Sequence, residues 1–187
     1  MMCAPASIRR PVVVGRSYAT PMTIVLLSLG SNLQPRRYLH AAVAALADKF
    51  GPLRVSPAYR TPAVGFEGPA FLNNAVQVDT DMDLEELDAW LHALEDAHGR
   101  DRSGPRFSDR TLDIDVVFYG DLVKQGPGHL RIPRPELKHA FVLKPLADIA
   151  PDFVDPVSGL TLQALWTAHP QHAQPFEVVA LDANAPD

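Results

Sequence analysis

Residues 106–119 read Arg106-Phe107-Ser108-Asp109-Arg110-Thr111-Leu112-Asp113-Ile114-Asp115-Val116-Val117-Phe118-Tyr119. From Leu112 onward the residues are mostly apolar, and many are β-branched or aromatic, which predicts a buried strand. Two carboxylates, Asp113 and Asp115, interrupt that strand. Side chains two positions apart project from the same face, with their backbones roughly 6.5–7 Å apart. Unpaired carboxylates on a buried face are costly, so we expect a cation beside them, either an upstream arginine or a divalent metal ion.

The D-x-D pattern offers the hard oxygen ligands that Mg²⁺ prefers, with water and phosphate oxygens usually completing the shell. The same pattern also occurs on edge strands that expose one face to solvent and bind nothing. The buried character of this strand and the arginines before it favour a metal site.

Four arginines lie just before this strand: Arg100, Arg102, Arg106 and Arg110. They alternate with small and polar residues, including glycine and proline, which is typical of a loop. Arginine forks bind phosphate oxygens, and a mobile loop can bring them over a bound ligand. The segment therefore predicts a phosphate-binding loop, and the alternative is a solvated surface loop with charges of both signs.

The overall composition is that of a globular chain. Its 187 residues are 47% hydrophobic and 21% charged, enough for one domain with a full core. The net charge of −5, without a basic stripe, argues against a nucleic-acid partner. A single cysteine, Cys3, excludes an internal disulfide framework and fits a reducing compartment, so we expect a cytoplasmic protein. No apolar run reaches the roughly 18 residues of a membrane span, so we expect no membrane partner. We expect a monomer that acts on small molecules.

Residues 1–21 differ from the rest of the chain, because they contain arginines, serines and prolines but no acidic residue. An organellar transit peptide has this composition, but the segment is short and lacks an amphipathic repeat. Met22 directly precedes the first predicted strand. We therefore expect residues 1–21 to be a disordered or non-native tail, residues 22–170 to be one domain, and residues 171–187 to be a C-terminal tail.

The hydrophobic pattern predicts alternating strands and helices up to about residue 120. Apolar, β-prone runs predict strands over 23–29, 53–60, 71–79 and 112–119. Helical spacing predicts one helix from Pro35 to Phe50, and a second from Leu84 to about His98 with Asp83 as its N-cap. The order β-α-β-β-α-β is the ferredoxin-like pattern, an α+β fold in which two helices cover one face of a four-stranded antiparallel sheet.

Beyond residue 120 we expect a C-terminal appendage of short elements, because prolines recur at 127, 133, 135, 145, 151 and 156. Residues 141–149 are expected to pack beside the sheet. Residues 160–166 are expected to form a last short helix.

Five motifs occur in order along residues 23–166: Ser28-Leu29-Gly30-Ser31-Asn32-Leu33, Tyr59-Arg60-Thr61-Pro62, Phe71-Leu72-Asn73-Asn74-Ala75-Val76, Arg110-Thr111-Leu112-Asp113-Ile114-Asp115 and Phe141-Val142-Leu143-Lys144-Pro145-Leu146. At this spacing they resemble the 6-hydroxymethyl-7,8-dihydropterin pyrophosphokinase family of folate biosynthesis. The fold of that family is the ferredoxin-like one that the order of elements predicts.

The resemblance implies an enzyme that transfers pyrophosphate from ATP to the hydroxymethyl group of 6-hydroxymethyl-7,8-dihydropterin and releases AMP. Asp113 and Asp115 match the ligands of two Mg²⁺ ions that bridge the phosphates. Arg100 and Arg110 match catalytic arginines, Arg110 also binding ATP. Further ATP contacts are implied for Glu95, Arg102, Arg106, Arg134 and Lys138.

The pterin site implied by the resemblance consists of Thr61, Pro62, Val64, Phe71, Asn73 and Phe141. A flat heterocycle binds aromatic faces and an amide that both donates and accepts, which Asn73 supplies. Without the resemblance, Phe71 and Phe141 would be interpreted as core aromatics.

The chain departs from the family pattern in two segments. Phe107 stands where tryptophan is common, and Ser108-Asp109 replace a Gly-Pro pair. Arg134 stands where histidine is common, and the segment after it is one residue shorter and ends in Lys138-His139. A guanidinium can still bind phosphate.

These departures leave a second function open, that of a catalytically silent ferredoxin-like relative that binds pterin or nucleotide as a regulatory module. A plain interaction domain that binds neither ligand is a third hypothesis. The retained carboxylate pair and loop arginines favour the enzyme, because they have little reason to exist without a metal-bound nucleotide.

Overall fold

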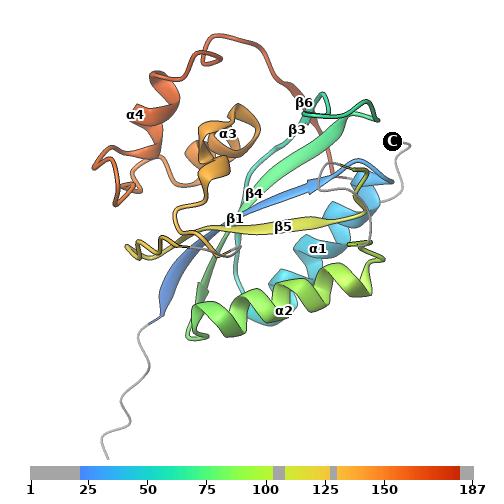
Figure 1. Cartoon of the computed structure of the whole chain (residues 1–187), viewed down its shortest axis with the longest axis horizontal. Coiled ribbons are helices and arrows are strands. Elements are labelled where there is room, and N and C mark those ends of the chain that lie inside the picture. The colour runs from blue at the N-terminus through green and yellow to red at the C-terminus, as the bar shows by residue number, and fades with distance from the viewer. Residues whose placement is uncertain (1–21, 103–107, 127–129, 182–187) are drawn as a thin grey trace, which may run out of the picture.

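The computed structural model describes residues 22–102, 108–126 and 130–181. An antiparallel sheet forms its centre, with strand order β5-β1-β4-β3-β6 and with β2 also paired to β4 (Figure 1). The strands are β1 (Thr23–Ser31), β2 (Arg54–Val55), β3 (Ala58–Thr61), β4 (Phe71–Thr80), β5 (Asp113–Tyr119) and β6 (Glu177–Val179). The helices are α1 (Pro35–Phe50), α2 (Leu84–Ala97), the 3-10 helix η1 (Pro135–Lys138), α3 (Ala140–Ile149) and α4 (Leu162–Thr167).

Helices α1 and α2 cover one face of the sheet because each carries a single apolar stripe. The buried apolar residues recur three or four positions apart: Leu39, Ala42 and Leu46 in α1, and Leu84, Leu87 and Leu91 in α2. A capping box between Asp83 and Glu86 fixes the point where α2 begins. Both stripes belong to one core with the inward residues of β1, which are Val25, Leu27 and Leu29.

The opposite face of the sheet is covered only in part. Helices α3 and α4 lie on that side, away from α1 and α2 (Figure 1). They form a second core with sheet residues Leu26, Ala75 and Phe118, to which Leu146 and Trp166 contribute from the helices. The strand ends beyond this core are therefore available to line a site.

The predicted ferredoxin-like unit is confirmed, with α1 and α2 together on one face. The predicted strand over 53–60 is divided into β2 and β3, because Pro57 has no backbone N–H to donate to the ladder. Ser56 keeps this point attached to β4, since its N–H donates to the Ala75 carbonyl at 2.9 Å and its hydroxyl accepts from the Ala75 N–H at 2.8 Å.

The C-terminal third adds cover and one more strand. Residues 141–149 lie in α3, which packs on the sheet as expected, and the helix expected over 160–166 is α4. Strand β6 lies within residues 171–187, where we expected a tail, and pairs with β3. Residues 1–21 lie outside the described residues. Among the helices that the structure describes, none is both long and apolar enough to cross a membrane.

Candidate active site

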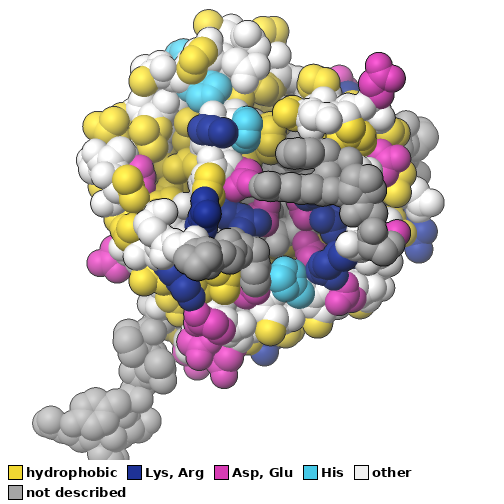
Figure 2. Space-filling view, viewed as in Figure 1, with side chains coloured by type: hydrophobic (Ala, Val, Ile, Leu, Met, Phe, Trp, Pro, Cys, Tyr) yellow, Lys and Arg dark blue, Asp and Glu magenta, His cyan; other side chains and the backbone are white. Residues whose placement is uncertain are grey.

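A cavity of about 680 Å³ opens on the partly covered face, over the ends of β1, β4 and β5. The sheet is its floor. One wall comes from the end of α2 and the residues after it, the other from residues 134–142, and the loop after β3 adds a third side. Figure 2 shows basic and acidic side chains gathered near the middle of the molecule.

The floor follows from strand alternation. Leu27, Leu29 and Ile114 point into the core beneath α1 and α2, so their neighbours in the same strands point into the cavity. These neighbours are Ser28 and Gly30 of β1 and Asp113 and Asp115 of β5. The strand register sets Gly30 between Asn73 and Asp113, and Ser28 opposite Asp115. The carboxylate pair thus shares one floor with Phe71 and Asn73, two of the residues expected to bind a pterin.

Every predicted site residue in the described part of the chain lines this one cavity. The set is Thr61, Pro62, Val64, Phe71, Asn73, Glu95, Arg100, Arg102, Arg110, Asp113, Asp115, Arg134, Lys138 and Phe141. Arg106, predicted to contact ATP, lies outside the described residues.

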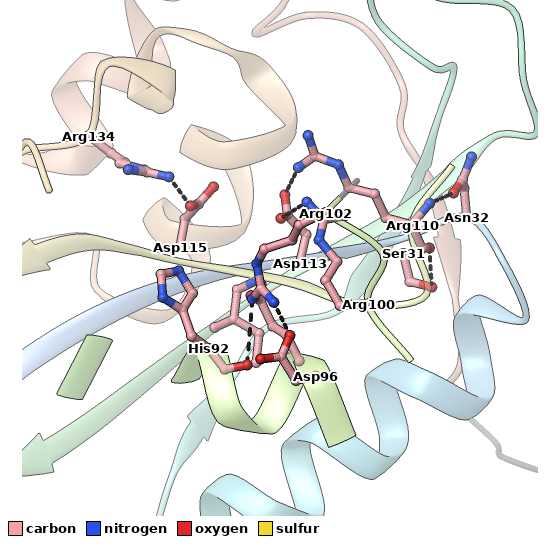
Figure 3. A network of polar contacts seen from close by, with 12 residues as sticks. Ser31, Asn32, His92, Asp96, Arg100, Arg102, Arg110, Asp113, Asp115 and Arg134 are labelled. Carbon is pink, nitrogen blue, oxygen red and sulfur yellow. Dashed lines mark hydrogen bonds and ion pairs between the residues drawn. The ribbon is translucent and has the colours of Figure 1, made fainter. Parts of the chain in front are cut away.

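Two guanidinium groups hold Asp113 (Figure 3). Arg100 Nη2 lies 3.0 Å from Asp113 Oδ1, and Arg110 pairs with Oδ2. The Arg100 side chain is only 12% exposed, and its Nε and Nη1 are buried with no hydrogen-bond partner among the described residues. Buried donors of this kind are costly unless a ligand satisfies them, so Arg100 is suited to an anionic group in the cavity.

Asp115 pairs with Arg134, which reaches it from the wall formed by residues 134–142 (Figure 3). The pKa of Asp115 is raised to about 6, because burial and the charge of Asp113 raise it more than Arg134 lowers it. Each carboxylate therefore has a cationic partner, as expected for acidic groups on a partly buried face.

Glu95 links the end of α2 to the strand that carries the aspartates. Its side chain is 4% exposed, Oε1 accepts a hydrogen bond from the Ile114 N–H at 2.7 Å, and Oε2 pairs with Arg102. Burial is the main cause that raises the pKa of Glu95 to about 7. The Ile114 N–H opposes that rise, Asp113 adds to it, and the two arginines Arg102 and Arg100 lower it.

Replacing Glu95 with glutamine is expected to flatten the pH dependence of the ligand-free protein's stability. The folded pKa of about 7 lies above the ordinary 4.5, so the folded state holds the proton more tightly than the unfolded state. Stability from this group is therefore fully present below pH 4.5 and is lost as the pH rises to about 7, by up to about 3 kcal/mol. Denaturant unfolding across this pH range measures the slope. The exposed Glu67→Gln variant is the control, and an unchanged slope in E95Q would contradict the assignment.

The other end of the cavity is aromatic and amidic. Asn73 Nδ2 donates to Thr61 Oγ1 at 2.8 Å, and Asn73 Oδ1 lies over Gly30, where a Cβ would come within 2.9 Å of it. Phe71 contacts Phe66 edge to face, with ring centroids 6.2 Å apart, and Phe141 stacks on His139 at 5.1 Å. Two flat faces and one amide therefore border the same space.

Asn32 was not predicted as a site residue. Its side chain connects the loop before β4, at Pro69, to the loop before β5, at Asp109 and Arg110. Its Nδ2 donates to Asp109 Oδ1 at 2.7 Å and to the Pro69 carbonyl at 3.3 Å, and its Oδ1 accepts from the Arg110 N–H at 2.7 Å. The residue stands in the first of the five motifs, which was the available signal. Ser28, which begins the same motif and lines the cavity, was also missed. Phe66 lines the cavity too, and nothing in its local sequence marks it.

The carboxylate pair fits a divalent cation that is bound partly by the protein and partly by a substrate. Among the described residues no group of three acidic, histidine or cysteine side chains could hold a metal ion. Mg²⁺ is commonly held by one or two carboxylates, with waters and substrate phosphates in the remaining positions. Asp113 and Asp115 supply that number of carboxylates, and they face a cavity lined by arginines.

Comparison with known proteins gives the family. The sequence profile described as 7,8-dihydro-6-hydroxymethylpterin-pyrophosphokinase (HPPK) matches residues 26–151. A Synechocystis 2-amino-4-hydroxy-6-hydroxymethyldihydropteridine pyrophosphokinase is 40% identical over 141 residues, which are 73% of this chain and 71% of that protein. The Pseudomonas aeruginosa protein of the same name is 39% identical over 153 residues, 78% of this chain and 91% of that one.

Solved structures agree on the fold. The Plasmodium falciparum HPPK-DHPS triple mutant S436F/A437G/A613T with pteroate superposes with a TM-score of 0.61 at 15% identity. The match covers 81% of this chain and 44% of the Plasmodium chain, so this chain corresponds to less than half of that protein. Sequence identity at this level supports the fold alone. From the profile match and the bacterial relatives together, the chain belongs to the 7,8-dihydro-6-hydroxymethylpterin-pyrophosphokinase family.

Proposed function

We propose that this chain transfers the pyrophosphoryl group of ATP to the hydroxymethyl group of 6-hydroxymethyl-7,8-dihydropterin in folate synthesis, and releases AMP. The observation that carries the proposal is one juxtaposition. The aspartate pair and its arginines share a single cavity with the amide of Asn73 and the rings of Phe71 and Phe141, and the aspartates share the sheet floor with Phe71 and Asn73. Phosphate-binding chemistry and a binding place for a flat heterocycle thus lie side by side.

In this proposal the carboxylates hold the metal-nucleotide. Asp113 and Asp115 would bind two Mg²⁺ ions through oxygens that now face arginines. When bound, such ions neutralise phosphate charge and hold the β-phosphorus in line with the attacking oxygen. Glu95 fixes the strand that carries both ligands, through its hydrogen bond to the Ile114 N–H.

The arginines would bind and orient the phosphates. Arg100 and Arg110 reach the cavity beside Asp113, and the buried N–H groups of Arg100 are available to phosphate oxygens. Further contacts to ATP are proposed for Arg102, Arg134 and Lys138, which line the same space, and for Arg106 from the sequence. Glu95 is proposed to lie near the nucleotide.

The pterin would lie at the aromatic end. Asn73 can offer its Oδ1 and amide hydrogens to the ring edge, and Phe71 and Phe141 can contact its faces. Thr61, Pro62 and Val64 border the same end of the cavity. With the ring there, the hydroxymethyl group would point along the floor toward the aspartates.

The proposed transfer is a direct displacement and needs no covalent enzyme intermediate. The hydroxymethyl oxygen attacks the β-phosphorus, the bond from that phosphorus to the α-β bridging oxygen breaks, and AMP leaves. The hydroxyl proton is released to solvent. Positioning and charge neutralisation by these side chains provide most of the catalysis expected for phosphoryl-type transfer.

Replacing Gly30 with alanine is expected to weaken pterin binding about tenfold and to leave nucleotide binding within about twofold. The new Cβ would lie 2.9 Å from Asn73 Oδ1 and 3.8 Å from Phe71 Cδ1, so it would push the amide off its position. The φ angle of Gly30 is not positive, so the effect comes from this contact and not from backbone strain. Calorimetric titration with each ligand measures both affinities. Equal weakening of both would place the pterin elsewhere.

The decisive test is AMP release from ATP and Mg²⁺ by the purified protein, with and without reduced 6-hydroxymethylpterin. We expect AMP only when the pterin is present. Binding of both ligands without AMP would instead support the silent regulatory module. We also propose that the enzyme acts as a monomer, and we expect it in the cytoplasm.

A further inference from the structure

The backbone of Arg134 is fixed against the strand that carries the aspartates. Its N–H donates to the Val117 carbonyl at 3.0 Å, two residues beyond Asp115. Prolines precede and follow it, and its backbone is extended at φ −62° and ψ 133°, as expected for a residue before proline. Any change of partner at this position therefore requires rotation of the side chain alone.

The guanidinium of Arg134 lies on Asp115 (Figure 3). The two side chains are only 20% and 28% exposed, so the pair is largely withdrawn from water. Charges in such a place interact more strongly than a surface ion pair does. Glu136 lies at the edge of the same group, with Oε2 3.8 Å from Arg134 Nε.

A cation already on Asp115 opposes a second one. A divalent ion that approaches this carboxylate meets a guanidinium a few ångströms away, and like charges at that distance repel strongly at a partly buried site. Asp113 differs in having two guanidinium partners, from Arg100 and Arg110, so removal of either leaves the other.

We propose that Arg134 is a built-in counter-cation that competes with the divalent metal ion for Asp115, and that nucleotide phosphates draw it away. Arg134 exchanges a carboxylate for a phosphate when ATP enters, which frees Asp115 for the ion. Metal binding and nucleotide binding are thereby coupled through one side chain. This inference rests on the proposed role of Asp115 as a metal ligand.

The test is Mn²⁺ binding without nucleotide, measured by the electron paramagnetic resonance signal of the free ion. In R134Q the ligand-free protein is expected to bind Mn²⁺ about tenfold more tightly than the wild type. R134K keeps a positive charge and is expected to fall between the two. The matched control is R131Q, which makes the same charge change three residues away, at an exposed arginine that contacts the Gly126 carbonyl.

The nucleotide dependence gives a second readout. With the uncleavable analogue α,β-methylene-ATP present, the difference in Mn²⁺ affinity between R134Q and the wild type is expected to shrink or reverse. The reason is that phosphate already holds Arg134 in the wild type. Thermal unfolding of each variant checks that it is folded.

Two outcomes would overturn the proposal, and only the second would also contradict the metal role of Asp115. If R134Q and wild type bind Mn²⁺ equally and D115N abolishes that binding, Asp115 is a metal ligand but Arg134 is not its competitor. If neither wild type nor R134Q binds Mn²⁺, even with the analogue, the metal role proposed for Asp115 fails as well.

Discussion

Asp115→Asn is expected to lower kcat roughly 10³-fold, or by about 4 kcal/mol of barrier, while the Kd for pterin changes less than about threefold. The substitution keeps the shape of the side chain and removes the charge that would hold a divalent ion. Asp115 lies on the sheet floor opposite Ser28, on the far side of Gly30 from the aromatic end of the cavity. Loss of its charge should therefore act on the phosphates and hardly on the pterin.

Single-turnover measurement of AMP formation, together with pterin titration, separates the two effects. Asp121→Asn is the matched control, since this exposed aspartate lies two residues beyond the end of β5 and does not line the cavity. It should leave both quantities unchanged. Parallel loss of turnover and pterin affinity in D115N would mean that Asp115 supports the shape of the site and not the transfer.

The local pattern of the sequence predicted the frame of this site. Period-two alternation in the strand of Asp113 and Asp115 placed both carboxylates on one face, and the structure confirms that both face the cavity. The apolar spacing likewise predicted helices from Pro35 to Phe50 and from Leu84 to about His98, and the structure has them at Pro35–Phe50 and Leu84–Ala97. Such features depend on near neighbours, so a sequence can express them.

Contacts between distant segments were not predictable in this way. Arg134 meets Asp115 across 19 residues, and the Asn32 side chain meets Arg110 across 78. We expected an upstream arginine or a metal ion beside the aspartates. Arg110 fulfils this at Asp113, whereas the partner of Asp115 is the downstream Arg134. Strand β6 was missed for a similar reason: three residues carry little signal, and the strand depends on its pairing with β3 and on Phe176 packing against Tyr59.

Arg110→Ala is expected to lower turnover strongly, the second large effect. The substitution removes the side chain and leaves the backbone contacts of Arg110 in place. The Arg110 N–H donates to Asn32 Oδ1 at 2.7 Å, and its carbonyl accepts from the Asn32 and Leu33 N–H groups at 3.0 and 3.2 Å. These bonds survive truncation to alanine, so the loop should keep its course. What is lost is the guanidinium, which pairs with Asp113 at the edge of the cavity.

Removal of that guanidinium should cost about 3–4 kcal/mol of barrier, or roughly 10²–10³-fold in kcat, as for a single preorganised electrostatic donor. The matched control is Arg60→Ala, whose guanidinium pairs with Glu177 of β6 and does not line the cavity. A drop in kcat of less than about tenfold in R110A would make the arginine a structural partner of Asp113. A rise in KM for ATP at constant kcat would mean that Arg110 binds the nucleotide equally in the ground state and the transition state. The large fall in kcat is expected because charge on the transferring group is redistributed during transfer, and a donor fixed beside Asp113 can follow it without reorganising.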